Sequence, residues 1–199
     1  DRNYSEARQP NVPALILEVL SHQNFKVRVK GHDPMFKFTV SRAIYKAILK
    51  YSAYQHRADY VVQPLPVTNF RSSLNMKNNE VVLEWNEVVD PLETTAVPNG
   101  YMVYVKVGDK GYDNGTFVRN NRFVHKVSPD KMYAYKVTAV NDGGESFPTE
   151  ELCAMISSKS KAKVLIVDGF QRVAGPQVVQ TDTTQGFDIS IDYGVPYYS

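Results

Sequence analysis

Apolar residues are spaced in three different ways along the chain, and each spacing predicts its own kind of structure. Residues 12–20, VPALILEVL, form a short apolar run that is closed by the polar residues 21–24. A run of this length is typical of a buried strand. Over residues 36–51, apolar side chains instead recur every three or four positions, after Asp33 and Pro34. An aspartate cap, a proline in the first turn and this period predict an amphipathic helix, which the chain reaches through a loop.

A second pattern, strict alternation of apolar and polar residues, covers residues 65–157. Alternation of this kind indicates half-buried strands. The stretches DNG at 113–115 and NDGGES at 141–146 are turn signals. About seven short strands in about 90 residues predict an antiparallel β-sandwich. The clearest strands are expected at residues 80–85, 100–107, 116–120, 122–127 and 132–140.

A third pattern follows the polar stretch SSKSKAK. Residues 163–170, KVLIVDGF, again read as a buried strand, and they contain Asp168 where the strand would end. Neither this piece nor the strand and helix at the start can bury its apolar face alone. We therefore expect a segment of a longer protein in four parts: the C-terminal end of an α/β domain (1–57), a linker (58–64), the sandwich (65–157) and the beginning of a third, α/β, domain (158–199).

Composition narrows the possible partners. The net charge is +2, from 23 Lys and Arg against 21 Asp and Glu, so charge does not favour nucleic acid. No apolar run approaches the roughly 20 residues that span a bilayer, so we expect no membrane span. The single cysteine, Cys153, excludes an internal disulfide and is expected in the core or late in a strand. Residues 167–176 match neither glycine-rich nucleotide motif.

Residues 65–157 resemble a fibronectin type III domain. PLPVTNF matches the proline-rich entry of that family, and Trp85 matches its tryptophan on the second strand. Tyr101 and Tyr104 match tyrosines of the third strand. YAYKVTAVNDGGES matches the sixth strand, with Tyr133 at the tyrosine-corner position. We expect Trp85, Tyr101, Tyr133 and Tyr135 in the core.

Glu18 is the charged residue inside the first apolar run, directly before the polar residues 21–24. Active sites of α/β sheets gather at the carboxyl ends of strands, so Glu18 is a candidate catalytic residue. The alternative is a strand-end glutamate that reaches solvent or pairs with an arginine. His22 either lines a cleft beside Glu18 or is a hydrogen-bonded loop residue. The four histidines share no ligand-like spacing, so they predict no metal site: His22, His32, His56 and His125.

The first region also resembles the C-terminal end of zinc-dependent N-acetylmuramoyl-L-alanine amidases. Glu18 matches the catalytic glutamate of that family, Asn24 the asparagine that ends the following loop, and Ala43–Ile44 a pair in the final helix. The resemblance implies that Glu18 acts as general base and acid beside a zinc-bound water, with His22 and Asn24 as candidate substrate-binding residues. It also implies that the zinc ligands precede this stretch, so no metal ligand is expected in this chain.

Two functions are consistent with these patterns. The first is a secreted bacterial hydrolase that acts on cell wall or polysaccharide, with zinc as cofactor and peptidoglycan or another glycan as partner. The order of domains also resembles exported bacterial proteins labelled xanthan lyase-like. The expected location is secreted, periplasmic or at the cell surface. The alternative is a non-catalytic extracellular module, for binding, adhesion or spacing, built on the sandwich.

Overall fold

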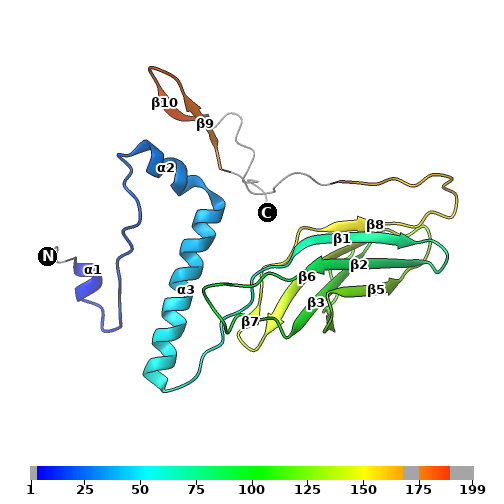
Figure 1. Ribbon diagram of the computed structural model, residues 1–199, viewed down its shortest axis with the longest axis horizontal. Coiled ribbons are helices and arrows are strands. Elements are labelled where there is room, and N and C mark those ends of the chain that lie inside the picture. Colours follow the sequence, from blue (N-terminus) through cyan, green and yellow to red (C-terminus); the bar gives the residue numbers. More distant parts are fainter. Residues whose placement is uncertain (1–3, 168–174, 189–199) are drawn as a thin grey trace. The chain divides into compact units, whose positions relative to one another are not determined.

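The computed structural model describes residues 4–167 and 175–188. The chain divides into two compact units, one made of Asp1–Tyr45 with Val167–Ser199 and the other of Lys46–Ile166. Each is described by itself (Figure 1). No helix among the described residues combines the length and the apolar character that crossing a membrane would require.

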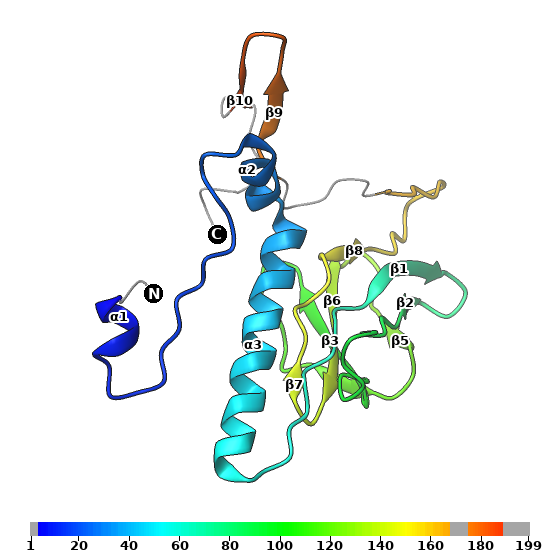
Figure 2. The same ribbon diagram turned by 60° about the vertical axis from the view of Figure 1, so that its left-hand side comes forward.

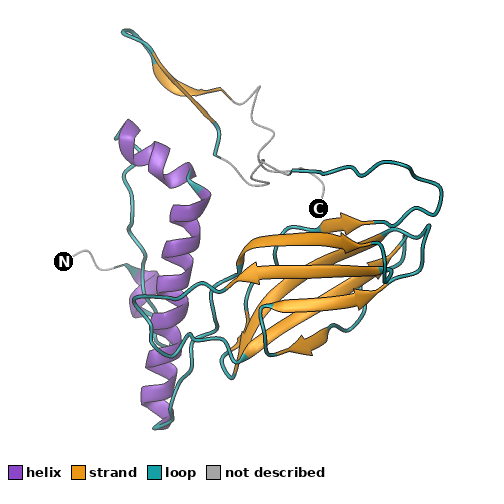
Figure 3. Cartoon of the chain, turned by 45° about the vertical axis from the view of Figure 1, so that its right-hand side comes forward, coloured by secondary structure: helices purple, strands orange, loops and turns teal. Residues whose placement is uncertain are grey.

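The second unit contains an antiparallel β-sandwich, as its alternating sequence predicts (Figures 1 and 3). One sheet has three strands in the order β1-β2-β5, and the other has five, ordered β4-β3-β6-β7 with β8 also paired to β6. The strands are β1 (Thr68–Asn75), β2 (Glu80–Asn86), β3 (Gly100–Val107), β4 (Thr116–Val118), β5 (Arg122–Lys126), β6 (Tyr133–Asn141), β7 (Gly144–Glu145) and β8 (Leu152–Ala154). The five strands expected from sequence are all present, with bounds that differ by at most two residues.

Inward-facing side chains of both sheets form the core. Trp85 is 1% exposed, and its ring meets those of Tyr101 and Phe70 edge-on, with centroids 5.2 and 6.5 Å apart. Tyr133 is buried at the start of β6, and its hydroxyl accepts a hydrogen bond from the backbone N–H of Ser128 at 3.0 Å. This contact is the tyrosine corner that the sequence predicts. The four aromatic residues expected in the core are therefore all confirmed.

The outer face of the three-stranded sheet carries paired charged side chains, which suit it to contact with solvent. In the register of β1, β2 and β5, Glu84 lies opposite Arg71 on one side and Arg122 on the other. The carboxylate is 3.2 Å from the Arg71 guanidinium and 4.0 Å from that of Arg122. Opposite charges across strands stabilise a solvated sheet face modestly.

Residues 58–64, expected as a linker, are part of the sandwich. Val62 and Pro64 are among its most deeply buried side chains. Two prolines, Pro64 in this segment and Pro66 just after it, suggested a break between domains, because proline ends a helical pattern. The segment instead packs against loops of the sandwich through contacts described below.

The first unit lacks the strand expected at residues 12–20 and has a helix where a loop was expected. Residues 12–20 are extended but belong to no strand, and Leu15 is 65% exposed. The prediction of a buried strand is therefore wrong for this structure, because a strand needs a neighbour for its backbone groups and no described residue supplies one. Residues 25–32, expected as a loop, form α2 (Phe25–His32), and a single turn near the start forms α1 (Ser5–Arg8).

The amphipathic helix is confirmed as α3 (Pro34–His56), an uninterrupted helix in Figure 2. Asp33 caps it, since the Asp33 carboxylate accepts a hydrogen bond from the backbone N–H of Met35 at 2.9 Å. None of its side chains is fully buried among the described residues.

The apolar run near the C-terminus is also exposed. Leu165 is 84% exposed, and residues 163–167, the described part of the buried strand expected at 163–170, form no strand. Asp168, its candidate terminal residue, lies outside the described residues. Farther on, β9 (Gln177–Gln180) and β10 (Gln185–Asp188) form an antiparallel hairpin. The α/β character of the third domain stays a prediction.

The core position of Trp85 makes a direct prediction. Trp85→Ala should lower the free energy of unfolding by about 3–5 kcal/mol, because a large buried ring leaves a cavity. Phe117→Ala is the control, since Phe117 is 49% exposed on β4 and should change stability by less than about 1 kcal/mol. Urea unfolding followed by far-UV circular dichroism measures both. Equal losses for the two variants would contradict the assignment of Trp85 to the core.

Candidate functional site: the two joints of the sandwich

The three site residues expected from sequence lie close together in the chain, on exposed backbone. Glu18 is exposed on the extended stretch 12–20, and His22 is exposed in the turn that follows. Asn24 is the N-cap of α2, and its side-chain oxygen accepts a hydrogen bond from the N–H of Val27 at 3.3 Å. The structure thus gives Asn24 a capping role. The catalytic role of Glu18 and the substrate-binding role of His22 stay predictions.

The part of the chain that the structure describes contains no group of side chains that could serve as zinc ligands. Within it, no three or more His, Cys, Asp or Glu side chains are grouped so that they could hold a metal ion. His125 lies on β5, where its Nδ1 is 2.9 Å from the hydroxyl of Tyr135. Burial lowers the pKa of His125, while the charge of Asp113 acts weakly in the opposite direction. No step through zinc is derived from these residues.

The sandwich is joined to the preceding chain by one buried side chain, Asn141, the last residue of β6. Asn141 is 8% exposed. Its Nδ2 lies 2.9 Å from the carbonyl oxygen of Val62 and 3.2 Å from those of Thr95 and Val97. The two hydrogens of the amide are shared among these three acceptors. The Asn141 Oδ1 accepts from the N–H of Gly143 at 2.9 Å, which fixes the amide in the orientation that points Nδ2 at the carbonyls.

Gly143 shows how closely the entering chain approaches. A Cβ atom at this position would lie 2.2 Å from the carbonyl oxygen of Val61, far inside van der Waals contact. The backbone at Val61 therefore packs directly on the turn between β6 and β7, and only glycine leaves room for it. The NDGGES stretch, which predicted a turn, also shapes this contact.

A chain of polar contacts continues from this joint to α3. The N–H of Val62 donates to the hydroxyl of Thr95 at 3.1 Å, and that hydroxyl donates to Glu93 Oε1 at 3.0 Å. Glu93 Oε2 is 3.0 Å from Lys50 Nζ, on α3. Lys46, one turn earlier, is 3.8 Å from Asp90. Residues 61–62, the loop between β2 and β3, and the last turns of α3 thus share one network, the entry joint.

The charges in the entry joint are set by burial and by pairing. The Glu93 side chain is 5% exposed, and burial alone would raise its pKa. Hydrogen bonds from Lys50 and Thr95 outweigh that effect, so the pKa of Glu93 lies below its ordinary value. The pKa of Lys50 is raised, mainly by its hydrogen bond to Glu93. Both groups are therefore charged near neutral pH, and removing either would leave a charge without its partner.

The chain leaves the sandwich through a second joint, made of Asp130 and Ser158. Asp130 accepts two hydrogen bonds from Ser158, one from the N–H at 2.9 Å and one from the hydroxyl at 2.5 Å. The N–H of Asp130 donates to the carbonyl of Ile156 at 2.8 Å. These bonds lower the pKa of Asp130, so the exit joint persists above the ordinary carboxyl pKa and is lost as the pH falls through the depressed one.

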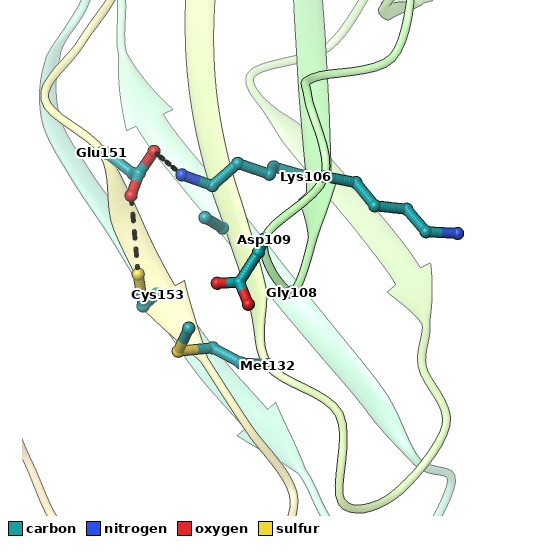
Figure 4. Close-up of a pocket in the computed structure, with 8 residues that line it drawn as sticks. Lys106, Gly108, Asp109, Met132, Glu151 and Cys153 are labelled. Atoms are coloured by element: carbon teal, nitrogen blue, oxygen red, sulfur yellow. Dashed lines mark hydrogen bonds and ion pairs between the residues drawn. The ribbon is translucent and has the colours of Figure 1, made fainter.

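A cavity of about 290 Å³ opens beside β8, lined by residues that include Lys106, Asp109, Met132, Glu151 and Cys153 (Figure 4). Two of its charged groups are paired, since Lys106 Nζ is 2.9 Å from Glu151 Oε2, and the Tyr112 hydroxyl also donates to Glu151. Of the two positions expected for Cys153, the structure gives the one on a strand and not the one in the core, since it is exposed on β8. Burial and the charge of Glu151 raise the pKa of the thiol, which keeps it protonated and a poor nucleophile.

The sequence only partly signalled the two joints. Asn141 was visible as part of a turn, but the partners of its amide lie 44 to 79 residues away in the chain. Glu93 and Asp90 sit in a loop whose acidic residues look solvated, because the sequence does not show which lysines approach them. The match to the sixth strand of fibronectin type III domains was the one usable signal, and it includes Asn141.

Comparison with known proteins adds information about the fold. No protein-family model matches the chain, and no curated protein matches it. Solved structures do match. Titin kinase with its flanking domains is 19% identical, with a TM-score of 0.39, over 48% of this chain and 18% of that one. The FN1–FN3 domains of chicken CNTN1 are 16% identical, with a TM-score of 0.41, over 51% and 34%. The fn3 domain of human contactin 1 is 14% identical, with a TM-score of 0.40, over 54% and 92%.

These likenesses concern the fold alone and cover about half of this chain. The class of the domain follows from its own geometry. The sandwich carries a buried tryptophan on the second strand, a tyrosine on the third that packs against it, and a tyrosine corner at the start of the sixth. This is a fibronectin type III-like β-sandwich.

Asn141 offers a sharp test of the entry joint. Asn141→Ala should lower the free energy of unfolding by about 2–3 kcal/mol, because unpaired buried carbonyl groups cost about 1–3 kcal/mol. Asn141→Asp should cost more, since a carboxylate would face three carbonyl oxygens and donate to none of them. Urea unfolding measures both variants.

The matched control is Asn99→Ala, because Asn99 makes an exposed hydrogen bond to Asp142 at 3.3 Å. It should change stability by less than about 0.5 kcal/mol. An Asn141→Ala variant as stable as Asn99→Ala would show that the amide does not hold the entry joint.

Proposed function

We propose that residues 58–158 act as a rigid, non-catalytic connector in which the entry joint and the exit joint fix the chain on both sides of the sandwich. The observation that carries this proposal is the pair of joints. A flexible linkage between domains would leave the flanking backbone solvated and mobile. Here the entering backbone is bonded by Asn141 and Thr95, and the leaving backbone is bonded by Asp130.

The two joints lie at opposite ends of β6. Asp130 precedes the first residue of β6, and Asn141 is its last residue. The nine residues of β6, at about 3.3 Å per residue, separate the joints by about 30 Å. A connector with this geometry holds its two attachment points at a fixed separation, which is what a spacer requires.

The fibronectin type III-like fold supports this proposal in general terms, because sandwiches of this kind serve as spacers or binding modules. Fold alone does not determine function, so the joints carry the argument. The ion pairs of α3 also support the connector proposal. Lys46 and Lys50 lie one turn apart on α3, and each reaches a separate carboxylate of one sandwich loop.

Backbone ¹⁵N relaxation tests the connector. Residues 61–64 and 156–158 should show order parameters near 0.85, the value typical of rigid backbone. Ser158→Ala should raise the mobility of residues 157–160 and leave the unfolding midpoint nearly unchanged. Ser160→Ala, which removes an exposed hydroxyl bonded to Ala162, should leave the mobility of residues 156–158 as it is. Order parameters below about 0.6 at 61–64 in the unmodified protein would contradict the proposal.

The hydrolase suggested by the amidase resemblance stays a separate proposal. The exposed carboxylate of Glu18 is accessible to solvent, as a proton-shuttling residue has to be before substrate binds. Zinc, a glycan substrate and an extracytoplasmic location depend on the same resemblance. In a longer protein that supplies zinc ligands, Glu18→Gln should abolish hydrolysis of a muramoyl peptide while zinc stays bound. Unchanged turnover would exclude this role for Glu18.

A further inference from the structure

Two segments of the first unit that lie far apart in the sequence are in contact. The hairpin β9–β10 lies beside α2 in both views of the ribbon (Figures 1 and 2). Phe187, on β10, makes the contact, with its ring centroid 5.4 Å from that of Phe25 and 4.6 Å from that of His32. Both phenylalanine side chains are partly buried.

The residues of α2 that meet Phe187 share one face of the helix. Phe25, Arg28 and His32 stand three and four positions apart, the spacing that aligns side chains along a helix. The Arg28 guanidinium carbon is 5.3 Å from the centre of the Phe187 ring, a distance at which a cation and an aromatic ring attract each other. One aromatic ring thus contacts a helix face that offers an aromatic, a cationic and an imidazole group.

The chain leading into the hairpin also follows α2. A Cβ atom on Gly175 would lie 3.0 Å from the carbonyl oxygen of His32, so this backbone runs against the C-terminal end of the helix. Leu20 approaches α2 as well, because a Cβ atom on Gly31 would lie 2.9 Å from Leu20 Cδ1. α2 is therefore contacted by residues that precede the sandwich in the sequence and by residues that follow it.

We propose that α2 is a docking surface for the β9–β10 hairpin of the same chain, so that the sandwich is inserted within one discontinuous unit. This inference does not depend on the connector proposal. The division of the chain into compact units supports it, since one unit combines residues that precede and follow the sandwich. It also replaces the expectation of two unrelated flanking domains with a single unit.

Nuclear Overhauser effects in the complete chain test the docking. The unmodified protein should show cross-peaks between ring protons of Phe187 and those of Phe25 and His32, because the ring centres are within 5.4 Å. Phe187→Ala should abolish these cross-peaks and move the His32 ring resonances, since the ring current of Phe187 is lost. Val179→Ala is the control, an exposed hairpin residue on β9, and should leave the His32 resonances in place.

An isotope-filtered experiment on a mixture of labelled and unlabelled protein identifies the source of the hairpin. Docking within one chain predicts no cross-peak between labelled and unlabelled molecules. Cross-peaks that appear only between molecules would show that a second copy supplies the hairpin, and would overturn the proposal. The absence of any cross-peak between Phe187 and Phe25 would overturn it as well. Neither result would affect order parameters at residues 61–64, so the connector proposal is judged separately.

Discussion

The side-chain amide of Asn141 is the contact on which the arrangement of the second unit depends. Three backbone carbonyls, from Val62, Thr95 and Val97, converge on its Nδ2 within 3.2 Å. The bond to the Val62 carbonyl is buried and the other two are partly buried. A buried carbonyl without a partner is costly. The amide therefore allows residues 58–64 to pack into the sandwich, and this packing brings Val62 and Pro64 into the core.

The entry joint also explains how a helix can end against a sandwich with little apolar contact. None of the α3 side chains is fully buried among the described residues. Two ion pairs instead connect α3 to the loop between β2 and β3, and within that loop Thr95 donates a hydrogen bond to Glu93. A nearly buried carboxylate such as Glu93 contributes specificity of position more than stability, because its desolvation cost offsets much of the attraction to Lys50. This suits a connector, in which orientation matters more than strength.

The sequence predicted those elements whose structure is determined locally. Alternation located the strands and placed Tyr133 in the core, and the Asp33–Pro34 pair located the start of α3. The resemblance to fibronectin type III domains placed Trp85 in the core. Prediction from sequence failed where the structure of a segment depends on residues that are distant in the chain. Residues 12–20 and 164–167 have the composition of buried strands, but a strand forms only beside another strand, and the described residues provide none. The helix α2 carries little apolar periodicity, so its sequence read as a loop. Residues 58–64, with prolines at 64 and 66, were interpreted as a linker, because nothing local shows that Asn141 will bind this segment.

Native-state hydrogen exchange of the Val62 amide tests the central claim most directly. This N–H donates to the hydroxyl of Thr95 at 3.1 Å, in the middle of the entry joint. If residues 58–64 belong to the sandwich, the amide should exchange with a free energy close to that of core amides of β6 such as Val137, which require global unfolding. Exchange at the rate of a solvated loop, while the β6 amides stay protected, would show that the segment is a free linker and would contradict the account.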